Sequence, residues 1–165
     1  MISLRKIVIP ADTLLKKYTS IAGAYTDCYT AEIARNVSFP GFVFAFYTTP
    51  LFKLERSILK FTISKPSTDL QARQVAEGES REFAAWSVES RSDNELLMCD
   101  FRGRTRSWFM TKGDGAKTQL YFGSAVVPKT GETSLDFGFR ALLGFHRVYS
   151  VLLLLSARSR LNPQR

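Results

Sequence analysis

The sequence predicts an α+β fold, in which an antiparallel sheet packs against a long C-terminal α-helix. Between residues 83 and 127, apolar and polar side chains alternate with a period of two, and turn residues interrupt the alternation. The residues after Leu135 instead place their apolar side chains at helical spacing. The chain has 165 residues, which is enough to bury a sizeable core, so a single domain over residues 1–165 is expected.

The N-terminal residues 1–24 are expected to form an arm beside a core of residues 25–160. The segment after Asp12 fits either a short helix or an arm that lies on the domain. The arm could cover the sheet, exchange between subunits or extend freely. Its first residues, MISLRKIVIP, contain too few consecutive apolar side chains for a secretory signal, which needs roughly seven to fifteen. No signal peptide is expected.

One strand and two short helices are predicted before the meander. Residues 25–34 alternate enough for a strand, and Pro40 lies near the start of the first helix. Thr49 and Pro50 mark the second start, because threonine caps helices and proline fits their first turn. An amphipathic stripe follows at spacings of three and four: Leu51, Leu54, Ile58 and Phe61. The polar residues 64–78 are predicted to be a loop with one or two helical turns.

Four strands are predicted in the meander, and each junction carries turn residues. The strands are expected at residues 83–91, 95–101, 105–111 and 118–127. Ser-Asp-Asn at 92–94 is typical of a turn, Arg102-Gly103 marks a bend, and residues 112–117 contain two glycines suited to a hairpin.

The C-terminal segment, residues 138–161, carries the only histidine of the chain, His146, just before the apolar run Val151–Leu155. A membrane span needs about 20 predominantly apolar residues, and here arginines interrupt the segment on both sides. Arg140, Arg147 and Arg158 fall opposite a broad apolar face, so the helix is predicted to pack on a sheet rather than to cross a membrane. That face contains Leu142, Leu143, His146, Tyr149, Ser150 and Leu153.

Charge and composition limit the classes of partner. The net charge of +8 favours anionic partners, but the positive residues are scattered, and no recognition helix or ribonucleoprotein motif points to nucleic acid. Cys28 and Cys99 are far apart and a single histidine cannot complete a metal site, so neither metal nor cofactor is expected. Reduced, buried thiols in the cytoplasm are the expectation for both cysteines.

The predicted order of elements resembles the helix-grip fold of the START-like (SRPBCC) superfamily. The segments ELLMCDFRGRTRSW, QLYFGSAVV and FRALLGFHRVYSVLL are similar to a bacterial family of unknown function within it, and the resemblance covers residues 25–160. It implies a curved antiparallel sheet wrapped around the C-terminal helix, with a cavity between them for hydrophobic ligands. The resemblance brings no catalytic residues, and fold alone does not fix function.

Two candidate sites follow. A ligand pocket under the C-terminal helix is expected to be lined by Trp86, Phe109, Phe122, His146 and Tyr149, although the same side chains could meet in a filled core. Arg104 and Arg106 share one strand face and could bind a carboxylate or phosphate as a pair. Their alternative is a solvated outer face with an Asp–Arg pair of little energetic value.

The leading hypothesis is the binding or carriage of a small hydrophobic molecule in this cavity, with a homodimer possible. An alternative is a cyclase- or dehydratase-like enzyme that uses His146 as an acid–base, with a pKa lowered by burial. The usual role of a lone histidine on a buried helix face is structural, with the ring donating to a neighbouring carbonyl or hydroxyl. A third hypothesis is an interaction module whose basic surface binds anionic partners.

Overall fold

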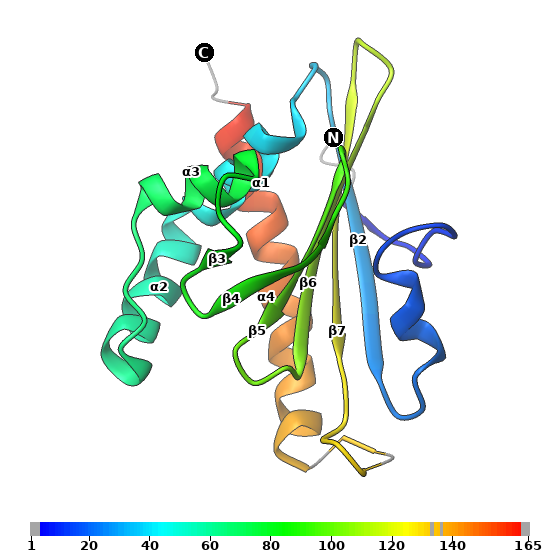
Figure 1. Cartoon of the computed structure of the whole chain (residues 1–165). Coiled ribbons are helices and arrows are strands. Elements are labelled where there is room, and N and C mark those ends of the chain that lie inside the picture. Colours follow the sequence, from blue (N-terminus) through cyan, green and yellow to red (C-terminus); the bar gives the residue numbers. More distant parts are fainter. Residues whose placement is uncertain (1–3, 133, 136, 163–165) are drawn as a thin grey trace.

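The structure is a computed structural model that describes residues 4–132, 134, 135 and 137–162. In these residues, strands form one antiparallel sheet in the order β1-β2-β7-β6-β5-β4-β3 (Figure 1). The strands are β1 (Leu4–Lys6), β2 (Tyr25–Ile33), β3 (Glu82–Phe83), β4 (Trp86–Arg91), β5 (Glu95–Asp100), β6 (Thr105–Gly113) and β7 (Thr118–Val126). The helices are a 3-10 helix η1 (Lys16–Ser20) and the α-helices α1 (Phe39–Tyr47), α2 (Pro50–Ile63), α3 (Asp69–Glu77) and α4 (Phe137–Leu161).

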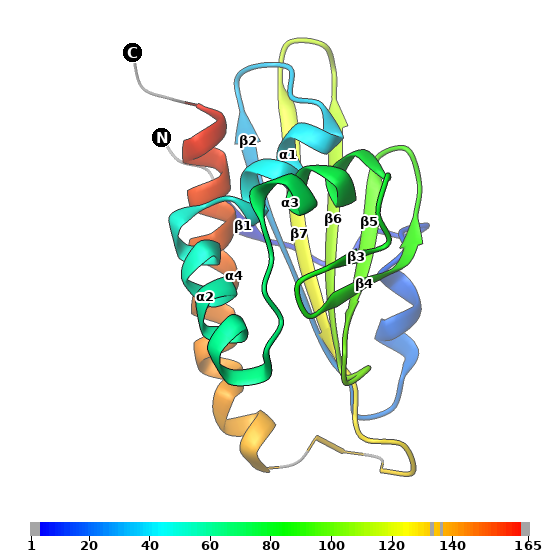
Figure 2. The same ribbon diagram turned by 60° about the vertical axis from the view of Figure 1, so that its left-hand side comes forward.

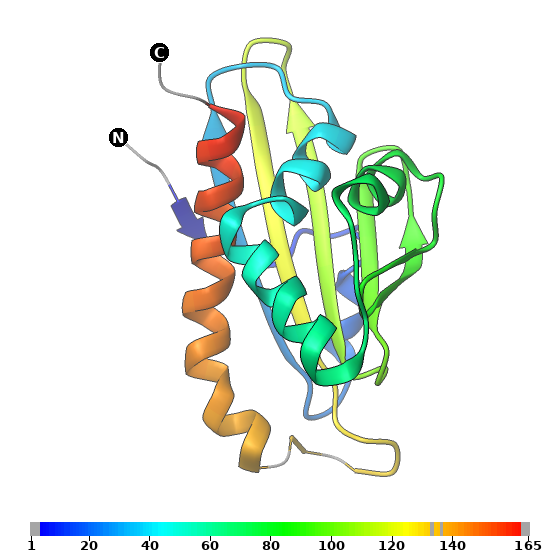
Figure 3. The same cartoon turned by 90° about the vertical axis from the view of Figure 1, so that its left-hand side faces the viewer.

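The predicted α+β class is confirmed. The sheet is curved and open, and the four α-helices lie on one of its faces, with α4 running along the length of the strands (Figures 1 and 3). We call this side the helix face and the opposite side the outer face. The first strand of the predicted core, β2, pairs with the last strand, β7. Two segments that are far apart in the sequence are therefore neighbours in the sheet.

Three helices between β2 and β3 begin at the residues that favour helix starts. The Ser38 hydroxyl accepts a hydrogen bond from the amide of Gly41 at 3.2 Å and caps α1. Thr49 caps α2 through the amide of Phe52 at 3.1 Å, which confirms the predicted start. These hydroxyls satisfy amides that the first helical turn leaves without partners.

The third of these helices, α3, replaces the predicted loop with one or two turns. A capping box between Thr68 and Gln71 starts it, because each side chain bonds the backbone amide of the other. Gly78 ends it in the left-handed conformation, with φ of 84°. Both signals are present in the sequence, but the many polar residues of the segment favoured a loop.

The predicted strand at residues 83–91 is in fact two strands joined by a tight turn. Phe83 pairs with Trp86, so Ala84 and Ala85 form a two-residue hairpin, and Ala84 has a φ of 53°. Glycine or asparagine usually marks such a turn, and alanine gives no such signal. The turn breaks the alternation, and both Phe83 and Trp86 therefore belong to the cluster on the helix face.

Aromatic side chains fill the space between α1 and the sheet. The Phe46 ring lies 4.8 Å from that of Phe109 and 4.7 Å from that of Phe122, measured between centroids. Tyr47, the next residue on α1, packs 4.7 Å from Phe83 and 4.9 Å from Phe52. The rings meet mostly edge-to-face or tilted, the geometries that aromatic pairs prefer, and they anchor α1 to the strands.

The helix α2 reverses the orientation that its apolar stripe suggested. Leu54, Ile58 and Phe61 are 59%, 53% and 82% exposed, so most of the predicted stripe points to solvent. Phe52 and Arg56 are buried instead. Arg56 is held there by Asp69 at 2.6 Å and by the side chain and carbonyl of Ser67, and these bonds offset the cost of burying its charge.

The described part of the N-terminal arm begins with the edge strand β1, which pairs with β2, and the segment that follows lies on the outer face of the sheet, as in the first of the three predicted arrangements. Leu15 is fully buried and belongs to a cluster with Trp108, Met110 and Leu97. Two carboxylates of the sheet hold this segment in place. Glu95 accepts a hydrogen bond from the Leu14 amide at 2.9 Å, and Glu89 accepts one from the Tyr18 hydroxyl at 2.5 Å. The outer face is therefore covered as the helix face is.

The packing predicted for the C-terminal helix is confirmed. Ser150 and Leu153 are buried, whereas Arg147 and Arg158 turn toward β2 and donate to the Tyr25 hydroxyl at 3.0 Å and the Glu32 carbonyl at 2.7 Å. The side chain of Leu142, which the sequence placed on the apolar face, lies outside the described residues. No helix in the described part of the chain has the length and apolar character that a membrane span requires.

The close approach of the arm to β7 predicts that Gly123 tolerates no side chain. A Cβ at this position would lie 2.6 Å from Cδ2 of Leu15, 2.9 Å from the Asp27 carbonyl oxygen and 3.0 Å from Cε3 of Trp108. We expect Gly123→Ala to lower the free energy of unfolding by about 1–3 kcal/mol in urea denaturation, because the overpacked core must shift.

The matched control is Gly144→Ala in α4, where no atom of the described residues lies within 4 Å of the added Cβ. Alanine is the better helix former, so this variant should be equally stable or up to about 1 kcal/mol more stable. Equal effects of the two substitutions would contradict the close packing of the arm.

Candidate functional site

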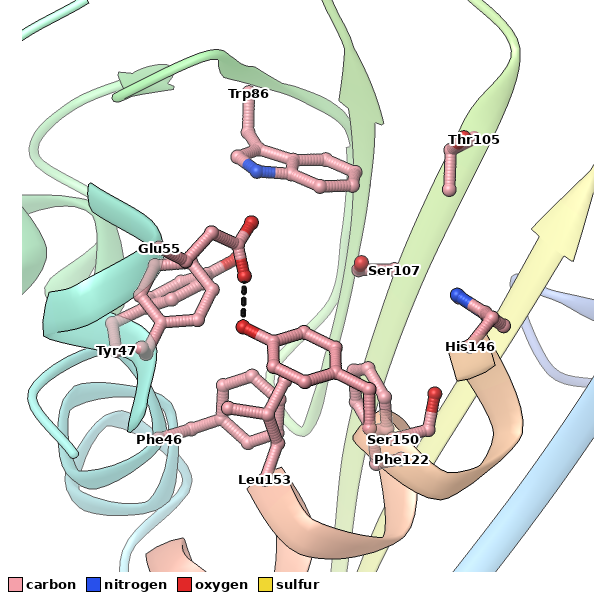
Figure 4. A pocket seen from close by; sticks show the side chains of 12 residues that line it. Phe46, Tyr47, Glu55, Trp86, Thr105, Ser107, Phe122, His146, Ser150 and Leu153 are labelled. Carbon is pink, nitrogen blue, oxygen red and sulfur yellow. Dashed lines mark hydrogen bonds between the residues drawn. The ribbon is translucent and has the colours of Figure 1, made fainter. Parts of the chain in front are cut away.

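A pocket of about 120 Å³ lies between the helix face of the sheet and helices α1, α2 and α4 (Figure 4). Its wall is mostly aromatic and aliphatic, with a few polar groups. The lining residues are Phe46, Tyr47, Phe52, Glu55, Trp86, Thr105, Ser107, Phe122, His146, Tyr149, Ser150 and Leu153.

The structure brings four of the five predicted pocket residues to this wall: Trp86, Phe122, His146 and Tyr149. Phe109 lies beneath them, with its ring 5.3 Å from that of Phe122, and belongs to the aromatic cluster under α1. The two alternatives drawn from the sequence, a pocket or a filled core, are therefore both present side by side. Aromatic side chains fill the region between α1 and the sheet, and the pocket occupies the neighbouring region, where β6 and α4 contribute to its wall.

The sequence analysis did not single out Tyr47 and Glu55, which come from α1 and α2. The Tyr47 hydroxyl is buried and has no hydrogen-bond partner in the described residues. Burial raises the pKa of Tyr47 far above its ordinary value, with a smaller contribution from Glu55, so its hydroxyl keeps its proton. A buried hydroxyl without a partner is costly and rare.

Glu55 and Tyr149 face each other across the pocket wall, and the dashed line in Figure 4 marks the hydrogen bond that the Tyr149 hydroxyl donates to the carboxylate. Burial raises the pKa of Glu55, although this hydrogen bond opposes the rise. Burial and the nearby Glu55 charge raise the pKa of Tyr149. In this pair, Glu55 is a partly desolvated carboxyl group and Tyr149 is a neutral hydroxyl that donates to it.

His146 belongs to a hydrogen-bonded chain that reaches β2. Its Nε2 lies 3.0 Å from the Ser124 hydroxyl, and that hydroxyl donates to Asp27 at 2.8 Å. The Tyr25 hydroxyl donates to the other Asp27 oxygen at 2.9 Å. Because the single proton of Ser124 goes to Asp27, His146 is the donor to Ser124 through Nε2–H.

This chain contains serine, histidine and aspartate, but not in the order that activates a nucleophile. In a catalytic triad the histidine stands between the serine and the acid and takes the serine proton. Here Ser124 stands between His146 and Asp27. Burial lowers the pKa of His146, despite the opposing charge of Asp27, so the ring is neutral near pH 7. The arrangement fits a hydrogen-bonding role.

Of the two arginines of the predicted anion site, Arg106 lies on the outer face of β6, whereas Arg104 precedes β6 and its Nε donates to the Val127 carbonyl at 3.4 Å. Arg106 donates to Glu89 at 2.9 Å, and its guanidinium lies 4.9 Å from the Tyr18 ring centroid. Asp100 accepts from the backbone amides of Arg104 at 2.7 Å and Thr105 at 2.9 Å. Arg106 thus has a carboxylate partner within the chain, and anion binding by the pair stays a prediction.

No family model and no curated protein matches the sequence. Among solved structures, the conserved protein of unknown function EF2215 from Enterococcus faecalis is similar, with 12% identity and a TM-score of 0.40 over 85% of this chain and 75% of that chain. CalU16 from Micromonospora echinospora is 9% identical, with a TM-score of 0.33 over 96% and 93% of the two chains. Likeness at this level identifies neither a site nor an activity.

The buried carboxyl predicts a pH dependence of stability. The pKa of Glu55 lies above its ordinary value of 4.5 in the folded chain, so above pH 4.5 the folded state holds more protons than the unfolded state. The free energy of unfolding therefore falls as pH rises from 4.5 through the folded pKa. Glu55→Gln has no proton to lose, and its stability relative to the natural chain should increase with pH over this window.

Urea denaturation of both proteins at a series of pH values measures this difference. Glu79→Gln is the control, because it makes the same chemical change at an exposed glutamate after α3, away from the pocket. A stability difference for Glu55→Gln that does not change with pH, or that changes no more than the difference for the control, would contradict the desolvation of this carboxyl.

Proposed function

We propose that the protein binds a small, uncharged and mostly apolar molecule in the pocket between the sheet and helices α1, α2 and α4. The observation that carries this proposal is the buried Tyr47 hydroxyl, which borders the pocket and lacks a partner in the described residues. A ligand with a hydroxyl or carbonyl group would satisfy it while the aromatic wall receives the rest.

The volume supports a ligand of about the size of one ring. A dry cavity of about 150 Å³ in another protein binds benzene, and this pocket holds about 120 Å³. Sites for larger molecules span about 300–1,000 Å³. A ligand with a long chain would therefore require α2 and α4 to move apart.

The electrostatics support an uncharged ligand. His146 is neutral near pH 7, and the two tyrosine hydroxyls at the wall, from Tyr47 and Tyr149, have raised pKa values. Glu55 is the single carboxyl among the lining residues, and it is engaged by Tyr149. Among the described residues that line the pocket there is neither a lysine nor an arginine. A negatively charged ligand would therefore lose its hydration without gaining a positively charged partner.

Membership of the START-like superfamily, a bacterial origin and a cytoplasmic location belong to this proposal as expectations from the sequence. The enzyme alternative is not carried further, because the His146 Nε2 bonds to a serine whose own proton goes to Asp27. A reaction would need a substrate proton within reach of the remaining ring nitrogen.

Native mass spectrometry of the purified protein is the direct test. A mass in excess of the denatured chain, lost on unfolding, is the expected result and gives the size of the ligand. A clean chain mass, together with no binding of the probes described next, would overturn the proposal.

The Tyr47 hydroxyl predicts selectivity between probes of equal size. Phenol and toluene both fit a ring-sized pocket, but only phenol carries a hydroxyl, so phenol should bind more tightly. Tyr47→Phe should reduce this preference by about fivefold in calorimetric titration, the equivalent of one neutral hydrogen bond.

The same substitution should raise the free energy of unfolding without ligand by about 1 kcal/mol, because it removes a buried hydroxyl that has no partner. Tyr121→Phe is the matched control, since Tyr121 packs on the outer face and should change neither the preference nor the stability by more than a few tenths of that amount. Equal effects of the two variants would contradict the role of Tyr47.

A further inference from the structure

Helices α2 and α4 lie side by side on the surface (Figures 2 and 3). An apolar groove of about 380 Å³ lies between them. Phe145 and Val148 of α4 are 69% and 60% exposed, and the outward stripe of α2 faces solvent beside them. The groove is lined by Leu51, Leu54, Glu55, Ile58, Phe145, Val148, Tyr149 and Leu152. A contiguous apolar surface of this kind marks an interaction site more often than chance exposure does.

The charges on these two helices are almost all positive. The sequence of α4 contains four arginines and neither aspartate nor glutamate. The single carboxyl of α2, Glu55, is directed inward to Tyr149. Exposed cations on the two helices include Lys53, Lys60, Arg140 and Arg147. The side chains that flank the groove therefore favour a partner with negative charge.

A basic hollow of about 290 Å³ lies on α2 next to the apolar stripe. It is lined by Lys53, Arg56, Ser57, Lys60 and Ser67. Asp69 already pairs with Lys53 at 2.7 Å and with Arg56 at 2.6 Å, whereas the Lys60 ammonium lies 5.7 Å from the Phe61 ring centroid and the side chain is exposed. The hollow and the groove together place hydroxyls and cations beside apolar side chains, as a phospholipid head and its chains require.

One end of the molecule adds further exposed aromatic rings. The end of α2, the start of α4 and the turn between β5 and β6 lie at this end in each view (Figures 1 to 3). Phe101 in that turn and Phe137 at the start of α4 are exposed, and the Arg102 guanidinium lies 5.2 Å from the Phe101 ring centroid. Aromatic rings with adjacent cations are typical of segments that lie in a membrane interface.

We propose that the α2–α4 face docks onto the surface of an anionic lipid membrane, with the apolar groove against the acyl boundary and the flanking lysines and arginines against the headgroups. A second copy of this chain fits less well, because a self-paired face would bring two sets of mostly positive side chains together. The proposal does not rest on a ligand in the inner pocket.

Flotation of the intact protein with lipid vesicles tests the proposal. The protein should float with vesicles of phosphatidylcholine mixed with phosphatidylglycerol, and about tenfold or more weakly with phosphatidylcholine alone, since each basic residue near an anionic surface contributes about a fivefold gain. Absence of flotation with both vesicles, or equal flotation with both, would overturn it.

Matched substitutions locate the surface. Leu54→Asp in the groove should weaken vesicle binding about tenfold or more, because a charge replaces an inserted side chain. Leu70→Asp is the control: it makes the same chemical change at a leucine on α3 that is 65% exposed, and binding should change less than about twofold. Equal loss in the two variants would overturn the assignment to this face.

Lys60→Glu and Lys16→Glu form a second pair, because Lys16 is exposed on η1 at the outer face. Only Lys60→Glu should weaken binding, by about tenfold or more, and the loss should shrink at high salt. Equal losses would indicate attraction by net charge alone and would overturn the docking geometry. A dimer in size-exclusion chromatography that Leu54→Asp dissociates, without vesicle binding, would assign the face to a second copy and also overturn the proposal.

Discussion

The seating of Phe46 between Phe109 and Phe122 is the contact on which the rest of the structure depends. It joins α1 to the two central strands β6 and β7, and it fixes the direction in which the chain continues into α2. The next residue, Tyr47, is carried into the same cluster, and its hydroxyl is buried as a result. The pocket is thus the part of the space under the helices that this cluster leaves unfilled, which explains both its small volume and its aromatic wall.

The two faces of the sheet are covered by different means. The helix face is sealed by rings and aliphatic side chains, whereas the outer face combines an apolar cluster around Trp108 with carboxylates that hold the N-terminal arm. Glu95 accepts from both the Leu14 amide and the Trp108 indole, and Glu89 joins Tyr18 to Arg106. Arg106, one residue of the predicted anion site, therefore also helps to attach one segment of the chain to another. Several hydrogen bonds to ionised groups in one place give such an attachment more strength than isolated surface pairs have.

The sequence predicted what its periodicity encodes and missed what depends on contacts between distant residues. The alternation in β5, β6 and β7 and the packed C-terminal helix followed from spacing, and four of the five residues expected at a ligand site border one pocket. The hairpin at Ala84 carries no glycine, and α3 is marked by its caps rather than by an apolar stripe. The orientation of α2 could not be read from its stripe, because Arg56 is turned inward by Ser67 and Asp69, which follow it on another segment. Tyr47 and Glu55 gained their significance only when α1 and α2 were placed over the strands.

The contact between Leu15 and Gly123 has a consequence for how this sequence can change over time. The two positions share one volume, since a Cβ at 123 would overlap the Leu15 side chain before any other atom. A smaller residue at position 15 removes the shortest of the three conflicts and leaves those with the Asp27 carbonyl and the Trp108 ring. Each replacement is costly alone, because a smaller residue at the fully buried position 15 leaves a cavity and a Cβ at position 123 overlaps its neighbours, so the two positions are expected to change together. Substitutions in the N-terminal segment and in β7 are therefore expected to depend on each other, although more than one hundred residues separate the two positions in the sequence.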